Sequence, residues 1–170
     1  MAYKMIDGDL IELAKNGEFQ VIAHGCNCFN AMAGGLAPQM AAAFGCDRFF
    51  LEGDKFEGMV QKLGKIDWQY NSKYKLFVVN AYTQYHPGPD IRYRALNQCM
   101  KSIGQIFEGK KIGLPKIGAG IAGGDWGTIE GIIKRTLKNC DVTVVNFNKP
   151  VVRPIPNPKT SIIKNKNVKK

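Results

Sequence analysis

Two glycine-rich segments constrain the fold of this chain more than any other feature. The first glycine segment covers residues 25–35 and the second covers residues 118–124. Each follows a short apolar run typical of a buried strand and precedes a stretch whose apolar residues have helical spacing. In a mainly parallel sheet such strand-to-helix connections meet at the edge formed by the carboxyl ends of the strands. We therefore expect both segments at one edge of one sheet.

The rest of the chain also alternates between strand and helix patterns. We expect strands at residues 21–24, 64–70, 75–81, 111–115 and 142–147, and helices at 36–44, 49–55, 91–107 and 125–137. The second and third strands form a hairpin in this interpretation, and residues 82–89 form a loop. Asp90 and Asp125 stand where helix N-caps belong. Continuous apolar strands between helices indicate an α/β fold with a mainly parallel sheet covered by helices.

The length of 170 residues fits one domain followed by a tail. The formal net charge is +10, and seven of the 24 basic residues lie from Lys149 onward, where no acidic residue occurs. Four prolines also interrupt this end of the chain. We divide the chain into a domain at residues 1–149 and a basic, proline-containing tail at residues 150–170. Such a tail allows weak contact with nucleic acid, or it serves only to keep the protein dissolved.

The composition also bears on location and on bound metals. No apolar run is long enough to span a bilayer and the N-terminus lacks a signal-peptide pattern, so we expect a cytoplasmic monomer without membrane contact. The five cysteines fit no disulfide scaffold. His24, Cys26 and Cys28 form an H-x-C-x-C pattern, but a zinc site needs a further ligand pair that the chain does not offer. We expect neither a metal nor a cofactor.

The glycine segments point to an anionic ligand. Glycine allows the backbone to turn tightly and to approach a ligand closely. A helix start behind such a loop offers free N–H groups and the positive end of the helix dipole. Gly118, Gly120 and Gly123 also match the dinucleotide pattern G-x-G-x-x-G, although the strand and acidic residue that should follow it are missing. The alternative is that the glycines only permit tight turns.

Four motifs together resemble the macro domain family over about residues 5–149. They are G-D-L at 8–10, H-G-C-N at 24–27, G-G-L-A at 34–37 and L-P-K-I-G-A-G-I-A-G-G-D-W at 114–126. The chain has histidine at position 24, where the family usually has asparagine. In this it resembles the branch of the yeast-type ADP-ribose 1''-phosphate phosphatases. The resemblance implies a three-layer α/β/α fold with a mixed, mainly parallel sheet. It also implies ADP-ribose or a derivative as the ligand.

The resemblance further implies roles for individual residues. Asp9, beside Leu10, would accept a hydrogen bond from the adenine amino group, and Phe147 would lie against the adenine ring. The alternatives are that Asp9 only caps a helix and that Phe147 is only an aromatic residue of the core. Asn27 would bind the hydroxyls of the distal ribose, which is the sugar beyond the diphosphate. Backbone N–H groups would hold the two phosphates, from Gly34, Gly35, Leu36, Gly118, Ala119, Gly120, Ile121 and Ala122.

Removal of the terminal phosphate from ADP-ribose 1''-phosphate requires groups that move protons. His24 is the candidate with a suitable intrinsic pKa, and Asp90 and Asp125 are the acidic candidates. Each has a structural alternative, as a buried histidine or as a helix N-cap. The glutamate-specific hydrolases of the family use a lysine that residues 90–93 lack. Three further functions stay open: an ADP-ribosyl hydrolase acting on modified macromolecules, a binding module without turnover, and a nucleic-acid binder that uses the tail.

Overall fold

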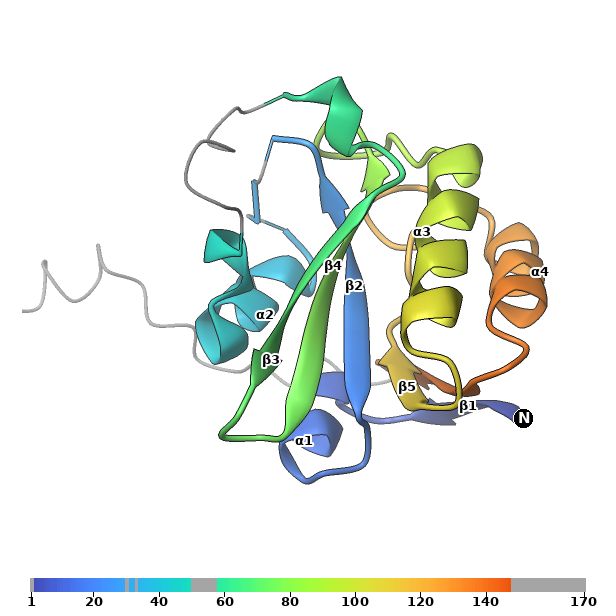
Figure 1. Ribbon diagram of the computed structural model, residues 1–170. Coiled ribbons are helices and arrows are strands. Elements are labelled where there is room, and N and C mark those ends of the chain that lie inside the picture. Colours follow the sequence, from blue (N-terminus) through green and yellow to red (C-terminus); the bar gives the residue numbers. More distant parts are fainter. Residues whose placement is uncertain (1, 30, 33, 50–57, 148–170) are drawn as a thin grey trace, which may run out of the picture.

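The computed structural model describes residues 2–29, 31–32, 34–49 and 58–147, and it has three layers with the sheet in the middle (Figure 1). The strands lie in the order β1-β6-β5-β2-β4-β3. Their bounds are β1 Tyr3–Asp7, β2 Val21–Asn27, β3 Ile66–Asn71, β4 Leu76–Gln84, β5 Lys111–Leu114 and β6 Asp141–Asn146. The helices are α1 Leu10–Lys15, α2 Ala37–Phe44, α3 Tyr93–Ile106 and α4 Trp126–Thr136, with 3-10 turns at Cys46–Arg48 and Val60–Lys62. The expected α/β fold class is confirmed.

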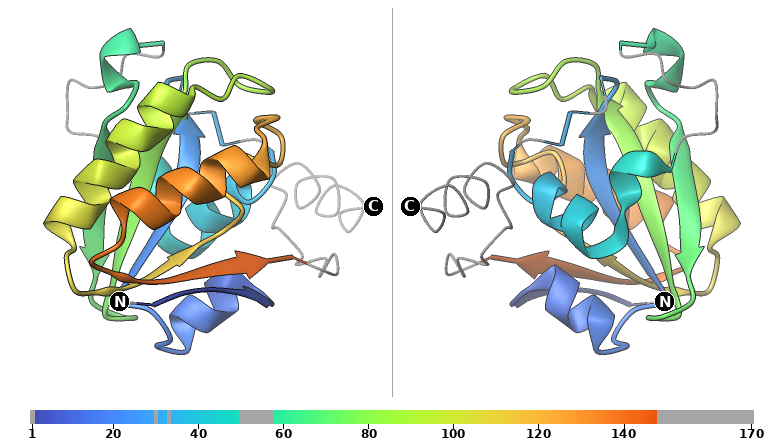
Figure 2. Two further views of the ribbon diagram at one scale, coloured as in Figure 1. Left: turned by 90° about the vertical axis from the view of Figure 1, so that its right-hand side faces the viewer. Right: turned by 90° about the vertical axis from the view of Figure 1, so that its left-hand side faces the viewer.

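Helices cover both faces of the sheet (Figure 2), and a hydrophobic core on each face holds the layers together. α3 and α4 cover one face, where Leu96 and Ile129 are fully buried against the strands. α1 and α2 cover the other face, where Leu10 and Met40 are fully buried. Because both faces are covered, the central strands carry the continuous apolar runs seen in the sequence.

The strand pairing is parallel except at one edge. β3 is antiparallel to β4, so the expected hairpin is confirmed. β1 pairs with β6 in parallel, from Tyr3–Val142 to Asp7–Asn146. The sequence analysis missed β1, because this short edge strand buries little of its surface and shows no clear apolar alternation. All parallel strands direct their carboxyl ends to the same edge of the sheet.

Two predictions around β4 were wrong. β4 continues through Gln84, so the first three residues of the expected loop at 82–89 belong to the strand. Tyr82 and Gln84 pair with the end of β2, and Thr83 lies between them where the register shifts. Asp90 does not cap α3, because Arg92 occupies the cap position with an extended backbone. The expected helix at 49–55 lies almost entirely, and the tail at 150–170 wholly, outside the described residues. No described helix has the length and apolar character needed to cross a membrane.

Candidate functional site

The central feature of the carboxyl-end edge is a cleft between β2 and β5. These neighbours pair only at Val21–Ile112 and Ile22–Gly113, and then they diverge. Beyond this point lies a cleft of about 440 Å³. It is lined by residues 24–27, 31–32, 34–37, 83–84, 87–88, 115–118 and 120–122. A cleft beyond the carboxyl ends of diverging strands is where open α/β sheets bind their ligands.

Both glycine segments line this cleft and contact each other across it. A Cβ at Gly34 would lie 2.7 Å from Ile121 Cδ1, so only glycine fits there without a shift of the isoleucine. Gly35 has φ +62°, a conformation that L side chains rarely adopt. α2 begins directly behind it with no side-chain cap and no acidic residue in its first turn. Pro38 has no N–H and the N–H of Gln39 donates to the carbonyl of Leu36, so the start of α2 offers a ligand mainly the positive end of the helix dipole.

The glycines of the second segment differ in backbone conformation and in the space available for a Cβ. Gly118 has φ +76°, and a Cβ there would lie 2.9 Å from Ile91 Cδ1. Gly124 would place a Cβ 2.5 Å from the carbonyl oxygen of Gly118. Gly120 lines the cleft, has no positive φ, and would place its Cβ in open space. The first two are required by the fold, whereas Gly120 leaves room in the cleft.

The N–H groups expected to hold phosphates fall into two sets. Ala119 already donates its N–H to the carbonyl of Lys116 and does not line the cleft. Within the described part of the chain, no acceptor is recorded for the N–H groups of Gly120, Ile121 and Ala122. These three groups and the positive end of α2 are what the cleft can offer to an anion.

His24 is buried beneath the cleft in a fixed tautomer. Asn80 donates its Nδ2 protons to the carbonyl of Cys46 and to Asp67, so its Oδ1 must accept from His24 Nε2, 2.7 Å away. Nδ1 of His24 is therefore the unprotonated nitrogen, and it is buried without a partner. Burial lowers the pKa of His24 to about 4, which keeps the ring neutral at physiological pH.

Asn27 uses its side chain to shape its own loop. Its Oδ1 accepts from the N–H groups of Phe29 and Ala31, and its Nδ2 donates to the carbonyl of Ala31 at 2.8 Å. In this structure the amide expected to bind the distal ribose is thus already bonded within residues 27–31. Its role toward a ligand stays a prediction.

Several predicted site residues lie outside the lining of the cleft. Asp9 accepts from the N–H groups of Ile11 and Glu12 at the start of α1, and Asp125 accepts from Thr128 at the start of α4. Both helix-cap interpretations are confirmed. Asp9, Leu10, Asp90, Ala119, Asp125 and Phe147 do not line the cleft. Leu10 is fully buried, and Phe147, which follows β6, has 37% of its surface exposed.

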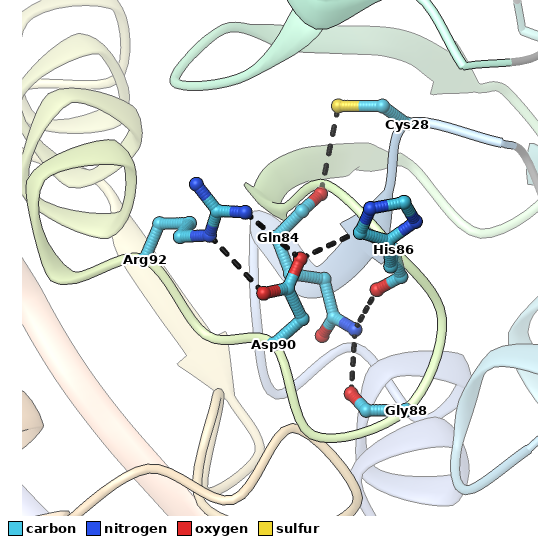
Figure 3. A network of polar contacts seen from close by, with 6 residues as sticks. All are labelled: Cys28, Gln84, His86, Gly88, Asp90 and Arg92. Carbon is cyan, nitrogen blue, oxygen red and sulfur yellow. Dashed lines mark hydrogen bonds and ion pairs between the residues drawn. The ribbon is translucent and has the colours of Figure 1, made fainter.

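A hydrogen-bonded loop forms the rim of the cleft at the end of β4 (Figure 3). Gln84 donates from Nε2 to the carbonyls of His86 and Gly88, at 2.7 and 2.8 Å. The N–H of His86 donates to Asp90, which also pairs with Arg92. These contacts, led by the His86 N–H, lower the pKa of Asp90. Asp90 is therefore an ionised carboxylate that holds the rim loop in shape.

The sequence analysis missed two residues of the cleft floor and rim. Thr83 is 1% exposed, lines the cleft, and has no hydrogen-bond partner for its hydroxyl. Gln84 fixes the rim loop from the last position of β4. Both lie in the stretch expected to be a loop, and only their place at the end of an apolar strand could have indicated a site. No cluster of metal-ligating side chains occurs among the described residues.

The three-layer fold and the cleft between β2 and β5 define this chain as a protein with the macrodomain fold. The macrodomain of Thermus aquaticus DarG superposes with a TM-score of 0.63 at 19% identity, over 87% of this chain and 99% of that one. Thermosipho africanus DarTG in complex with ADP-ribose gives 0.69 at 16% identity, over 92% of this chain and 44% of that one. A Bacteroides thetaiotaomicron protein of unknown function gives 0.70 at 27% identity, over 86% and 99%.

The sequence comparison identifies the family more narrowly. The chain is 38% identical over 156 residues to the uncharacterized 17.5 kDa protein of the tk-vs intergenic region of Enterobacteria phage T4. The match covers 86% of this chain and 97% of the phage protein. The chain therefore belongs to the family of that T4 protein. No family model matches the chain.

Proposed function

We propose that the protein binds ADP-ribose or a derivative of it in the cleft between β2 and β5. The observation that carries this proposal is the convergence of two N–H-rich turns, in contact at Gly34 and Ile121, on one cleft. Two turns on opposite walls suit two linked phosphates better than a single anion. The Thermosipho protein, which was solved with ADP-ribose, has the same fold.

The sheet order gives the ligand a direction in this proposal. Asp9 and Phe147 follow β1 and β6, which lie on one side of β5. β2 and β4 lie on the other side of the cleft. The adenosine would extend toward the ends of β1 and β6, as the resemblance implies for these two residues. The distal ribose would then lie over β2 and β4.

Calorimetric titration of the purified protein tests this proposal. We expect one site for ADP-ribose and for ADP, and weaker binding of AMP because AMP lacks the second phosphate. Inorganic phosphate serves as the control for unspecific anion binding. Absence of heat with both ADP-ribose and ADP, for a protein shown to be folded by circular dichroism, contradicts the proposal.

A second proposal concerns catalysis at the same cleft. Hydrolysis of ADP-ribose 1''-phosphate requires attack of water on phosphorus, cleavage of the bond to the sugar oxygen, and transfer of a proton to that oxygen. The neutral His24 has an unpartnered acceptor, Nδ1, and lines the cleft, which favours a role as proton acceptor. Its low pKa makes His24 a weak base and leaves almost none of it protonated at pH 7, so the proton for the sugar oxygen has to come from water or from another group.

A phosphate-release assay on ADP-ribose 1''-phosphate tests this activity. We expect release by the wild type and a loss in His24→Gln, with ADP-ribose binding as the control for an intact cleft. Loss of label from ADP-ribosylated macromolecules without phosphate release would instead support an ADP-ribosyl hydrolase. Binding of ADP-ribose without either product would support a module that only binds.

A further inference from the structure

Thr83 carries a buried hydroxyl that the fold itself does not use. It lies near the end of β4 with 1% of its surface exposed, and its Oγ1 has no hydrogen-bond partner. Among the described residues, the other buried side-chain nitrogen or oxygen without a partner is Nδ1 of His24. An unpaired buried hydroxyl is unfavourable, so its presence in the lining of a cleft indicates a partner brought by a ligand.

The surroundings of Thr83 keep this hydroxyl in place without giving it a hydrogen-bond partner. Its backbone carbonyl accepts from the N–H of Arg92 at 3.0 Å, which fixes the main chain. Gly25 stands beside it on β2 with no positive φ, so its conformation does not require glycine. A Cβ at Gly25 would lie 3.0 Å from Thr83 Oγ1 and 3.3 Å from Ile117 Cγ1. Glycine at this position therefore avoids crowding the hydroxyl.

The position of Thr83 selects one part of the ligand. β4 lies on the side of the cleft opposite β1 and β6, where the proposed function places the distal ribose. Asn27, expected to bind that sugar, is bonded to its own loop. We propose that Thr83 Oγ1 hydrogen-bonds a hydroxyl of the distal ribose and thereby favours diphosphates that carry a second sugar. This inference rests on the proposed function.

Two variants of Thr83 and two ligands separate this role from others. Thr83→Val keeps the shape of the side chain and removes the hydroxyl, whereas Thr83→Ser keeps the hydroxyl. ADP-ribose carries the distal ribose and ADP lacks it. In calorimetric titrations we expect Thr83→Val to lower the affinity for ADP-ribose about tenfold, the usual effect of one lost hydrogen bond. The affinity for ADP should not change. Thr83→Ser should bind both ligands like the wild type.

The melting temperature of the free variants provides the structural control. Because Oγ1 has no partner within the protein, Thr83→Val should melt no lower than the wild type. An equal loss of affinity for ADP and for ADP-ribose would place the contact at a phosphate and overturn the inference. Unchanged affinity for ADP-ribose, or a lowered melting temperature, would overturn it as well. A wild type that binds neither ligand would overturn the proposed function and this inference together.

Discussion

At the scale of single residues, His24 links the stability of the fold to pH. Its ring is 2% exposed and bonded through Nε2 to Asn80, and burial lowers its pKa from 6.5 to about 4. Between these two values the unfolded chain binds a proton that the folded protein does not bind. The contribution of His24 to stability is therefore complete above pH 6.5 and is lost as the pH falls toward 4.

We expect the free energy of unfolding to be about 1.3 kcal/mol lower at pH 5.5 than at pH 7.5 because of His24 alone. Urea denaturation at the two pH values measures this difference. His24→Asn, which does not titrate, is the matched control and should show a smaller difference between the two pH values. The same pH dependence in both proteins would contradict the low pKa of His24.

Gly118 and Gly120 should respond in opposite ways to a side chain. Gly118→Ala should lose about 1–2 kcal/mol of stability, because its φ of +76° and the nearby Ile91 disfavour a Cβ. Gly120→Val should melt like the wild type, since no atom lies within 4 Å of its Cβ position, yet it should bind ADP-ribose more weakly. Thermal melts and calorimetry together measure both effects. A Gly120→Val protein with normal affinity would show that the ligand does not approach this residue.

The sequence predicts the backbone of the site better than its side chains. The glycine segments could be recognised because tight turns with positive φ favour glycine, as at Gly35 and Gly118. The partners of His24 and Asn27 could not be predicted. They depend on Asn80, which is 56 residues away from His24, and on the hydrogen bonds of Asn27 to the backbone of Phe29 and Ala31. Whether the side chains act on a ligand is decided by such contacts.

At the scale of elements, Asp125 caps the start of α4, and two variants can distinguish this structural role from a catalytic one. Its carboxylate accepts from the N–H and hydroxyl of Thr128, and these bonds lower its pKa. Asp125→Ala should therefore lower the melting temperature by a few degrees, whereas Asp125→Asn should keep the cap and the stability. Phosphate release by Asp125→Asn then measures the chemical role of the carboxylate. Full activity in this variant would show that Asp125 acts only as a helix cap.

The bounds of helices and strands were predicted more accurately where the element buries more of its surface. α2, α4 and β6 carry apolar residues at regular spacing, and their predicted bounds agree with the structure within two residues. β1 has mostly exposed residues, and its conformation depends on pairing with β6, which is distant in the sequence. The end of β4 contains polar residues such as Thr83 because it borders the cleft. A polar strand end resembles a loop until its pairing partner is known.

At the scale of the whole molecule, the positive charge and the cleft belong to different parts of the chain. The cleft is complete within residues 24–122, whereas +7 of the net charge of +10 follows Asn148, with seven basic residues and no acidic one. A chain that ends at Asn148 should bind ADP-ribose like the full chain. Its affinity for single-stranded DNA, measured across salt concentrations, should fall and depend less on salt. Equal DNA binding by both chains would exclude the tail as the contact.

The pairing of β1 with β6 also has a consequence for synthesis on the ribosome. Within the described sheet β1 pairs with β6 alone, and the Ala2 carbonyl accepts from the N–H of Val142. β5, which completes the middle of the sheet, is also translated late. A nascent chain that ends before about residue 146 therefore lacks the strand that pairs with β1, and one that ends before β5 lacks one side of the cleft. Premature termination should yield unfolded fragments rather than a smaller working protein.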